Sequence, residues 1–245
     1  MTHEVLLSVV LGTSIAGFVQ GLSGFAFGLV AMSVWAWSIE PQLAAPMVVF
    51  GSVVGQLLAF GTVRHSFDVR RAMPFIIGGV FGVPLGVLLL RHVDARLFRG
   101  AVGCCLVIYC SVMLLVRHLP SVTVGGRILD GIVGWIGGVM GGLGGLTGPA
   151  PTLWCVMRGW DRDSQRAVFQ SFNLVMQVLT LGVYAASGTL NFRMAGIFAV
   201  MVPTSILPTL AGVRLYRRLG TAGFQRLVLG LLLISGLMLV ASLYR

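Results

Sequence analysis

Two glycine-rich stretches, residues 21–28 and 141–151, hold the residue types in this chain that could bind a small anion. A break in a helix leaves backbone N–H groups without partners, and the N-terminal end of the following half-helix carries about half a positive charge. Such an end attracts anions, and glycine lets the backbone approach a ligand closely because it has no Cβ. The residues expected to line this anion site are Ser23, Gly24, Phe25, Gly28, Gly144, Gly145, Thr147 and Gly148.

Polar side chains recur on the helix expected after each glycine-rich stretch. Ser52 and Gln56 lie four residues apart. Asn173 and Gln177 have the same spacing, and Gln170 lies three residues before Asn173. Residues at these spacings share one face of a helix, so each set forms a polar stripe. The stripes could coordinate substrate oxygens from the side or form interhelical hydrogen bonds worth about 0.6 kcal/mol each. Both interpretations stay open for Asn173 and Gln177, whereas packing is favoured for Ser52.

The same glycines have a second explanation. Their spacing of four residues produces small-xxx-small pairs, which are a common device for close helix packing in membranes. Two prolines, Pro149 and Pro151, lie in the second stretch and remove amide donors from a helix interior. Because the glycine pattern is also duplicated, in segments too long for a single span, a helix break is favoured over packing alone.

The elements that must position these residues are membrane-spanning helices. Of the 245 residues, 57% are hydrophobic and only 10% are charged, and the mean hydropathy is +0.96. Most uncharged runs are close to the ~20 residues that cross a hydrocarbon core. Lipid offers no partner to backbone amides, so such spans must be helices, and the alternating segments of a β-barrel are absent. The sequence therefore predicts an all-α polytopic membrane protein and excludes an ordinary cytosolic enzyme.

The charged residues lie between the apolar runs. All 17 basic residues are arginines, which membrane orientation and anionic lipid headgroups explain, so the expected partner is the lipid bilayer rather than nucleic acid. The four cysteines have no histidine at ligand spacing, and neither a metal nor a cofactor is expected. All seven acids lie at or near predicted span ends, so no deeply buried carboxylate is expected for a proton relay or a sodium site.

The chain contains an internal repeat. Residues 17–28 align with residues 137–148, with four glycines and one valine in common. We therefore expect two membrane repeats, 1–120 and 121–245, which together form one transmembrane domain. Each repeat has a broken or re-entrant glycine-rich first segment followed by three transmembrane helices. If both first segments are re-entrant, most arginines fall on one side, as the positive-inside rule favours, and the repeats are inverted, with a transporter-like site near the midplane.

Motifs of the second half resemble those of a known family. The stretch Gly144-Gly145-Leu146-Thr147-Gly148-Pro149, the Asp-containing loop with Arg166-Ala167-Val168 and the duplicated eight-segment plan are similar to the TauE/SafE family of sulfite exporters. The resemblance implies a multi-pass permease of the bacterial inner membrane for sulfite, sulfoacetate, sulfolactate or related organic anions. It also implies a substrate path at residues 21–28 and 141–149. Phe25-Ala26-Phe27 departs from the glycine-dense family pattern, which could favour a substrate with an organic portion.

These observations predict a secondary transporter, most simply an exporter of small sulfur-containing or organic anions, with no enzymatic activity. An anion moving out of an inside-negative compartment gains about 2.3 kcal/mol per 100 mV, so potential-driven efflux needs no coupling ion. Two alternatives stay open: an importer of organic sulfonates or carboxylates, and a non-transporting membrane assembly subunit. The sequence also leaves open whether copies associate as a homo-oligomer.

Overall fold

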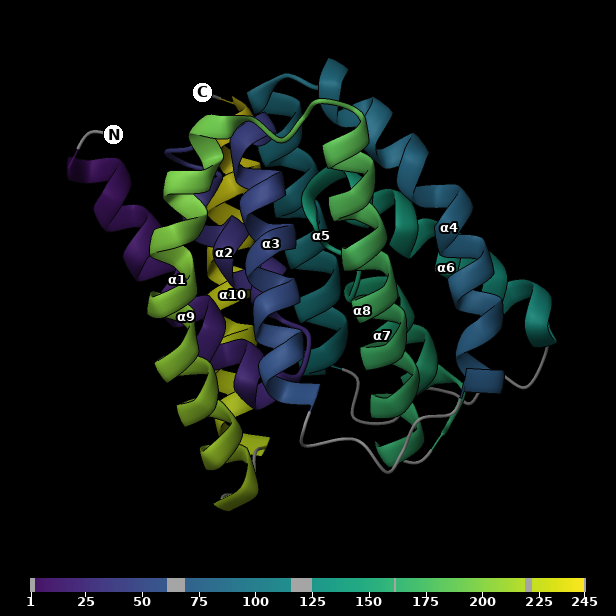
Figure 1. Cartoon of the computed structure of the whole chain (residues 1–245). Helices are drawn as coiled ribbons and strands as arrows, with labels where there is room; N and C mark the ends of the chain where they lie inside the picture. Colours follow the sequence, from purple (N-terminus) through teal and green to yellow (C-terminus); the bar gives the residue numbers. More distant parts are fainter. Residues whose placement is uncertain (1–2, 61–68, 116–124, 161, 219–221, 245) are drawn as a thin grey trace.

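The computed structural model describes residues 3–60, 69–115, 125–160, 162–218 and 222–244, which form one helical bundle (Figure 1). The helices are α1 (His3–Ser23), α2 (Phe27–Trp35), α3 (Pro41–Phe60), α4 (Val69–His92), α5 (Ala95–Leu115), α6 (Gly126–Gly144), α7 (Pro149–Met157), α8 (Arg162–Ala186), α9 (Phe192–Arg218), α10 (Ala222–Ala241) and the short 3-10 helix Ser242–Tyr244. This part of the chain contains no strand, which confirms the predicted all-α class.

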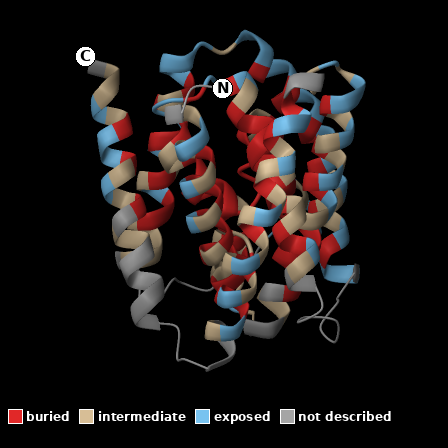
Figure 2. Cartoon of the chain, turned by 60° about the vertical axis from the view of Figure 1, so that its left-hand side comes forward, coloured by how far each residue is buried: buried red, intermediate tan, exposed pale blue. Residues whose placement is uncertain are grey.

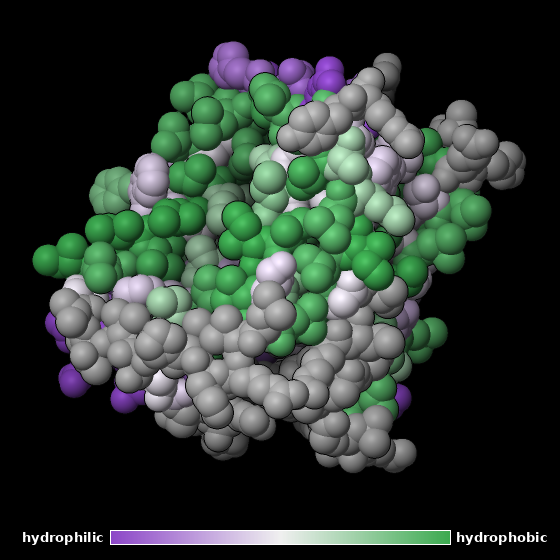
Figure 3. Space-filling view, turned by 180° about the vertical axis from the view of Figure 1, so that it is seen from behind, coloured by the Kyte–Doolittle hydropathy of each residue, from purple (hydrophilic) through white to green (hydrophobic). Residues whose placement is uncertain are grey.

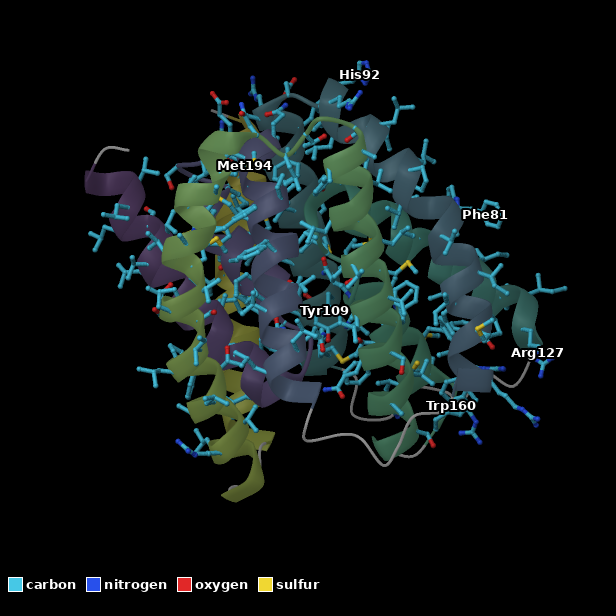
Figure 4. All side chains as sticks on the ribbon, in the orientation of Figure 1. Phe81, His92, Tyr109, Arg127, Trp160 and Met194 are labelled. Atoms are coloured by element: carbon cyan, nitrogen blue, oxygen red, sulfur yellow. The ribbon has the colours of Figure 1, made fainter. Side chains whose placement is uncertain are left out.

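The outer surface of the bundle is apolar across its middle. Among the described residues, six helices are long and apolar enough to cross a membrane. These spans are Val5–Ser23, Pro41–Leu58, Arg70–His92, Ala95–Leu114, Ala167–Ala186 and Met194–Leu215. Large apolar side chains face outward from them, such as Phe81, which is 71% exposed (Figure 4). Seen from behind, hydrophobic residues fill the middle of the surface and hydrophilic ones gather toward its ends (Figure 3). This distribution matches the lipid-facing surface expected from the composition.

The short helices α2 and α7 run back along the helices that precede them. At the end of α2, Trp35 Nε1 donates a hydrogen bond of 3.0 Å to the carbonyl oxygen of Ser8, near the start of α1. In α7, Trp154 Nε1 donates one of 2.7 Å to the carboxylate of Asp130, near the start of α6. Each long glycine-rich segment is therefore a hairpin of one long and one short helix.

Close packing between helices depends largely on glycines outside the two turns. Helix α4 packs along α6 through Gly82 and Gly138, and α1 packs along α9 through Gly21 and Gly212. A Cβ at any of these four positions would collide with the backbone of the facing helix. Gly17 faces the same helix as Gly21. The packing explanation therefore holds for the glycines that precede the first turn, as small-xxx-small pairs predict.

The short arms of the hairpins and the two turns lie inside the bundle. Seven of the nine residues of α2 are buried, and the side chains of Phe27 and Trp35 are fully so. Phe172 of α8 is also fully buried, and buried residues follow the inward faces of the helices (Figure 2). Helix α1 begins at the same end of the bundle at which α10 ends (Figure 1). The turns between the paired helices are therefore enclosed by the longer helices.

Candidate functional site

The chain turns at one glycine in each hairpin. Gly24, directly after α1, has a φ of +85°, and Gly145, directly after α6, has a φ of +70°. A residue with a Cβ would lose about 1–2 kcal/mol in this left-handed conformation. Each turn leads into a helix N-terminus, at Phe27 in α2 and at Pro149 in α7. These two turns are called break 1 (residues 24–26) and break 2 (residues 145–148).

Each break is held by a glutamine of the next long helix. Gln56 Nε2, in α3, donates a hydrogen bond of 2.9 Å to the carbonyl oxygen of Gly24. Gln177 Nε2, in α8, donates one of 2.9 Å to the carbonyl oxygen of Gly145 and one of 3.1 Å to Thr147 Oγ1. All these bonds are buried. The side-chain amide nitrogens of both predicted glutamines therefore bond to the backbone of the breaks and fix its shape.

The hydroxyl groups of Ser23 and Thr147 play different roles. Ser23 Oγ donates to the carbonyl oxygen of Val19 over 2.8 Å and accepts from the amide of Ala26 over 3.1 Å. Thr147 Oγ1 accepts from Gln177 instead. Both hydroxyls are predicted to line the anion site, but the structure places Ser23 in a local cap and Thr147 against a side chain.

The two breaks touch each other. A Cβ at Gly28 would lie 2.8 Å from the carbonyl oxygen of Gly145, and one at Gly148 would lie 2.6 Å from Cδ2 of Phe25. The ring of Phe25 also meets Phe169 edge-on at a centroid distance of 5.3 Å. Because glycine at these positions is what allows the approach, the substitution of either would push the breaks apart.

The inward face of α8 joins the two breaks. Gln170 lies beside break 1, since a Cβ on Gly24 would come within 2.5 Å of its Nε2 atom. Gln177 lies beside break 2, and Asn173 lies between them on the same helix face. Their exposed fractions are only 8% for Gln170, 2% for Asn173 and 3% for Gln177.

Several polar atoms on this face have no hydrogen-bond partner. They are Gln170 Nε2, both amide atoms of Asn173, Gln177 Oε1 and, at the end of the face beyond Gln177, Thr180 Oγ1. An unsatisfied polar group in a protein interior costs about 1–3 kcal/mol, so each one in a folded protein calls for an explanation. Both amide atoms of Asn173 lack a partner, and Asn173 lies between Gln170 and Gln177 along the helix.

Backbone donors are distributed unequally between the two helix N-termini. Within the described residues, no hydrogen bond reaches the amides of Phe27, Gly28 or Leu29, the first three positions of α2. In α7 the first and third positions are Pro149 and Pro151, which have no N–H. The first turn of α2 therefore offers more free amides than the first turn of α7.

Two of the predicted lining residues lie at the margin of this arrangement. The carbonyl oxygen of Ser52 accepts a hydrogen bond of 3.0 Å from Gln20 Nε2, and its side chain is 4% exposed. A Cβ at Gly144 would face Phe98 at 3.4 Å and Met32 at 3.6 Å. The remaining predicted residues come together at or beside the two breaks, through the contacts described above.

Sequence patterns did not reveal three residues that surround break 1. Gln20 is fully buried in α1 and donates to α3, and Tyr109 of α5 packs edge-on against Phe25 at a centroid distance of 6.1 Å. Phe169 is the third. Tyr109 lies in the middle of the bundle (Figure 4). A lone aromatic residue or glutamine in an apolar helix gives no signal of its own, because its neighbours come from distant parts of the chain.

Asp130 departs from the expectation that no carboxylate is deeply buried. It lies near the start of α6, as predicted, but its exposed fraction is only 4%. Its carboxylate accepts the Trp154 hydrogen bond and lies 3.6 Å from Nε of Arg158. Arg158 in turn lies over the ring of Trp160, at the end of the bundle where Figure 4 labels Trp160. A charged contact therefore closes the mouth of the second hairpin, whereas the neutral bond of Trp35 closes the first.

In the part of the chain that the structure describes, no group of three or more histidine, cysteine, aspartate or glutamate residues is arranged to hold an ion. The four cysteines are free thiols, two of them buried. What the arrangement can do is present neutral hydrogen-bond donors and acceptors to a small polar ligand.

Comparison with known proteins gives one match. The profile of the sulfite exporter TauE/SafE family matches residues 9–239, nearly the whole chain. Searches of curated proteins and of solved structures gave no match.

Proposed function

Because this chain belongs to the TauE/SafE sulfite exporter family of membrane transporters, we propose that it exports small sulfur-containing or organic anions such as sulfite or sulfoacetate. The chain is a multi-pass membrane protein, and the bacterial inner membrane is consistent with its family. The substrate would bind between break 1 and break 2.

One observation, on Asn173, supports the placement of the substrate between the two breaks. Asn173 is almost fully buried between the breaks, yet both atoms of its amide lack a partner. A buried amide is stable only when hydrogen-bonded, so the site is built for a polar ligand rather than for packing alone. Gln170 Nε2 and the free amides of α2 supply further donors for an oxyanion at break 1.

The contacts between helices support two inverted repeats, residues 1–120 and 121–245. In this arrangement α1 corresponds to α6, α3 to α8 and α4 to α9. The pairs α1 with α9 and α6 with α4 are then equivalent, as are α3 with α9 and α8 with α4. The hydrogen bonds of Gln56 and Gln177 to the two break glycines are likewise equivalent, each spanning 32 residues. Such repeats with a broken first helix carry their substrate site near the midplane in other secondary transporters.

Direction follows from the membrane potential. If both hairpins return to the side from which they start, most arginines lie on one side, which the positive-inside rule makes cytoplasmic. Because the membrane potential is negative inside the cell, an anion that leaves gains about 2.3 kcal/mol per charge at 100 mV. Export by this route needs no carboxylate-based coupling site at the breaks.

The test is transport in proteoliposomes that contain the purified full chain. We expect efflux of sulfite or sulfoacetate that accelerates when the vesicle interior is made negative. Asn173→Leu should slow it at least tenfold, because an orphaned donor and acceptor are lost, whereas Thr13→Val should leave it unchanged. Thr13 is a matched control, since it is fully buried with an unpartnered hydroxyl but lies in α1, about three turns before break 1.

The other outcomes distinguish the alternatives. Uptake that runs only into the vesicles against the imposed potential would indicate an importer. A folded protein that moves none of these anions, with Asn173→Leu affecting only its stability, would point to an assembly subunit and overturn the proposal.

A further inference from the structure

We infer that the transported anion carries its own hydrogen-bond donor, such as a hydroxyl or amino group, in addition to its oxyanion head. This inference rests on the proposed function and narrows its substrate class at the same site, because the sulfite and sulfoacetate dianions carry no such donor. It comes from the mixture of unpartnered donors and unpartnered acceptors on the inward face of α8.

The donors suit an oxyanion. Gln170 Nε2 lies beside Gly24, and the free amides at the start of α2 belong to the same break. The oxygens of a sulfonate or carboxylate accept hydrogen bonds and donate none, so they can satisfy these groups. The oxyanion head is therefore expected at break 1.

The acceptors require something else of the ligand. Gln177 Oε1 has no partner, while Nε2 of the same side chain is fixed by Gly145 and Thr147. Asn173 has one unpartnered donor and one unpartnered acceptor, and exchanging its oxygen and nitrogen leaves that count unchanged. An oxyanion without a donor would place its own lone pairs against these oxygens and leave them unsatisfied.

Spacing along α8 separates the two requirements. At 1.5 Å of rise per residue, Gln170 and Gln177 are about 10 Å apart along the helix axis, with Asn173 between them. Along α8 the unpartnered donor of Gln170 lies toward break 1, and the unpartnered acceptor of Gln177 lies toward break 2. The ligand that fits has its charged head at one end and its donor group a few bonds away.

Two sulfonates that differ by a single hydroxyl group test this inference. Isethionate (2-hydroxyethanesulfonate) and ethanesulfonate have the same charge and carbon skeleton, so any difference in affinity reports the donor. Each is titrated, as its sodium salt at constant ionic strength, against the thermal stability of the purified full chain, which rises with ligand saturation. We expect isethionate to bind at least about tenfold more tightly, because its hydroxyl satisfies a buried acceptor.

Variants on α8 locate the effect. Asn173→Leu should weaken both ligands and bring their affinity ratio close to one, and Asn173→Ala provides a second variant if the leucine protein does not fold. The control Thr13→Val, in α1, should preserve the wild-type ratio. The ratio in the wild-type protein needs no variant, so it decides the question by itself.

Each result has a defined meaning. Equal affinities in the wild-type protein, or tighter binding of ethanesulfonate, overturn the inference while the proposed function stands. An unchanged ratio in a folded Asn173→Leu protein supports the inference with Gln177 Oε1, rather than Asn173, as the acceptor of the hydroxyl. If neither sulfonate binds although sulfite transport is observed, the inference fails alone; if no anion is bound or transported, the proposed function fails with it.

Discussion

Break 1 and break 2 share a plan and differ in what they offer a ligand. Both turn at a glycine with positive φ, and both have that glycine's carbonyl held by a glutamine. Break 1 contains the bulky Phe25 yet leaves three amides of α2 free. Break 2 is dense in glycine, but α7 begins with two prolines and so lacks most of its donors.

This difference shows that glycine density is a poor measure of anion-binding capacity. Glycine permits close approach, but only N–H groups bind an anion, and proline removes them. In break 2 the glycines instead make room for the other half of the protein: Gly148 accommodates Phe25, and Gly145 lies against Val48 and Val49. Break 2 is thus packed as a rigid wall, whereas the first turn of α2, next to break 1, has more free amides than the first turn of α7.

The largest effect should come from placing a methyl group at each turn. Gly145→Ala should destabilise the protein by about 3 kcal/mol, from the cost of positive φ and from overpacking against two stiff β-branched valines. Gly24→Ala meets only the flexible end of Gln170, and we expect about 1–2 kcal/mol. Thermal or denaturant unfolding of both variants measures this difference, and equal losses would contradict the division into wall and donor site.

Removing the glutamine contacts should give the next largest effect. Gln177→Leu loses bonds to two acceptors and should cost about 2 kcal/mol, whereas Gln56→Leu loses one bond and should cost about 1 kcal/mol. Unfolding free energies compare them directly. A larger loss at Gln56 would mean that break 1, and not break 2, is the more rigid of the two.

The mouths of the hairpins offer a smaller contrast. A double-mutant cycle with Asp130→Asn and Arg158→Gln should give a coupling energy of about 1 kcal/mol, since the pair is close but Arg158 is partly exposed. Asparagine keeps an acceptor for Trp154, so the cycle isolates the charge. The neutral hydrogen bond of Trp35 closes the first hairpin. The loss of stability caused by Trp35→Phe should therefore be the same with or without Asp130→Asn or Arg158→Gln in the second hairpin.

The smallest effect is expected where a donor is restored. Pro151→Ala returns an N–H to the third position of α7. If the oxyanion head binds at break 1, ligand affinity should stay within about twofold, because the new donor lies on the wrong break. A marked gain in affinity, measured by the isethionate and ethanesulfonate titrations, would mean that the oxyanion head of the ligand binds at break 2.

Much of this organisation could be predicted from the sequence. Apolar runs of the right length fix the helices, because a backbone in lipid has to satisfy its own hydrogen bonds. The duplicated glycines and Pro149 indicated where the long segments turn, and the polar stripe at Gln170, Asn173 and Gln177 identified the face of α8 that meets both turns. These are local properties, which a pattern of residue types carries by itself.

What the sequence could not supply was the partner of each group. It does not show that Gln56 and Gln177 donate hydrogen bonds to the break glycines, whereas both amide atoms of Asn173 have no partner. It also placed Asp130 near a helix end without showing that α7 folds back to bury it. A hydrogen bond or a buried charge depends on atoms that lie far apart in the chain, and only the tertiary structure brings those atoms within reach of one another.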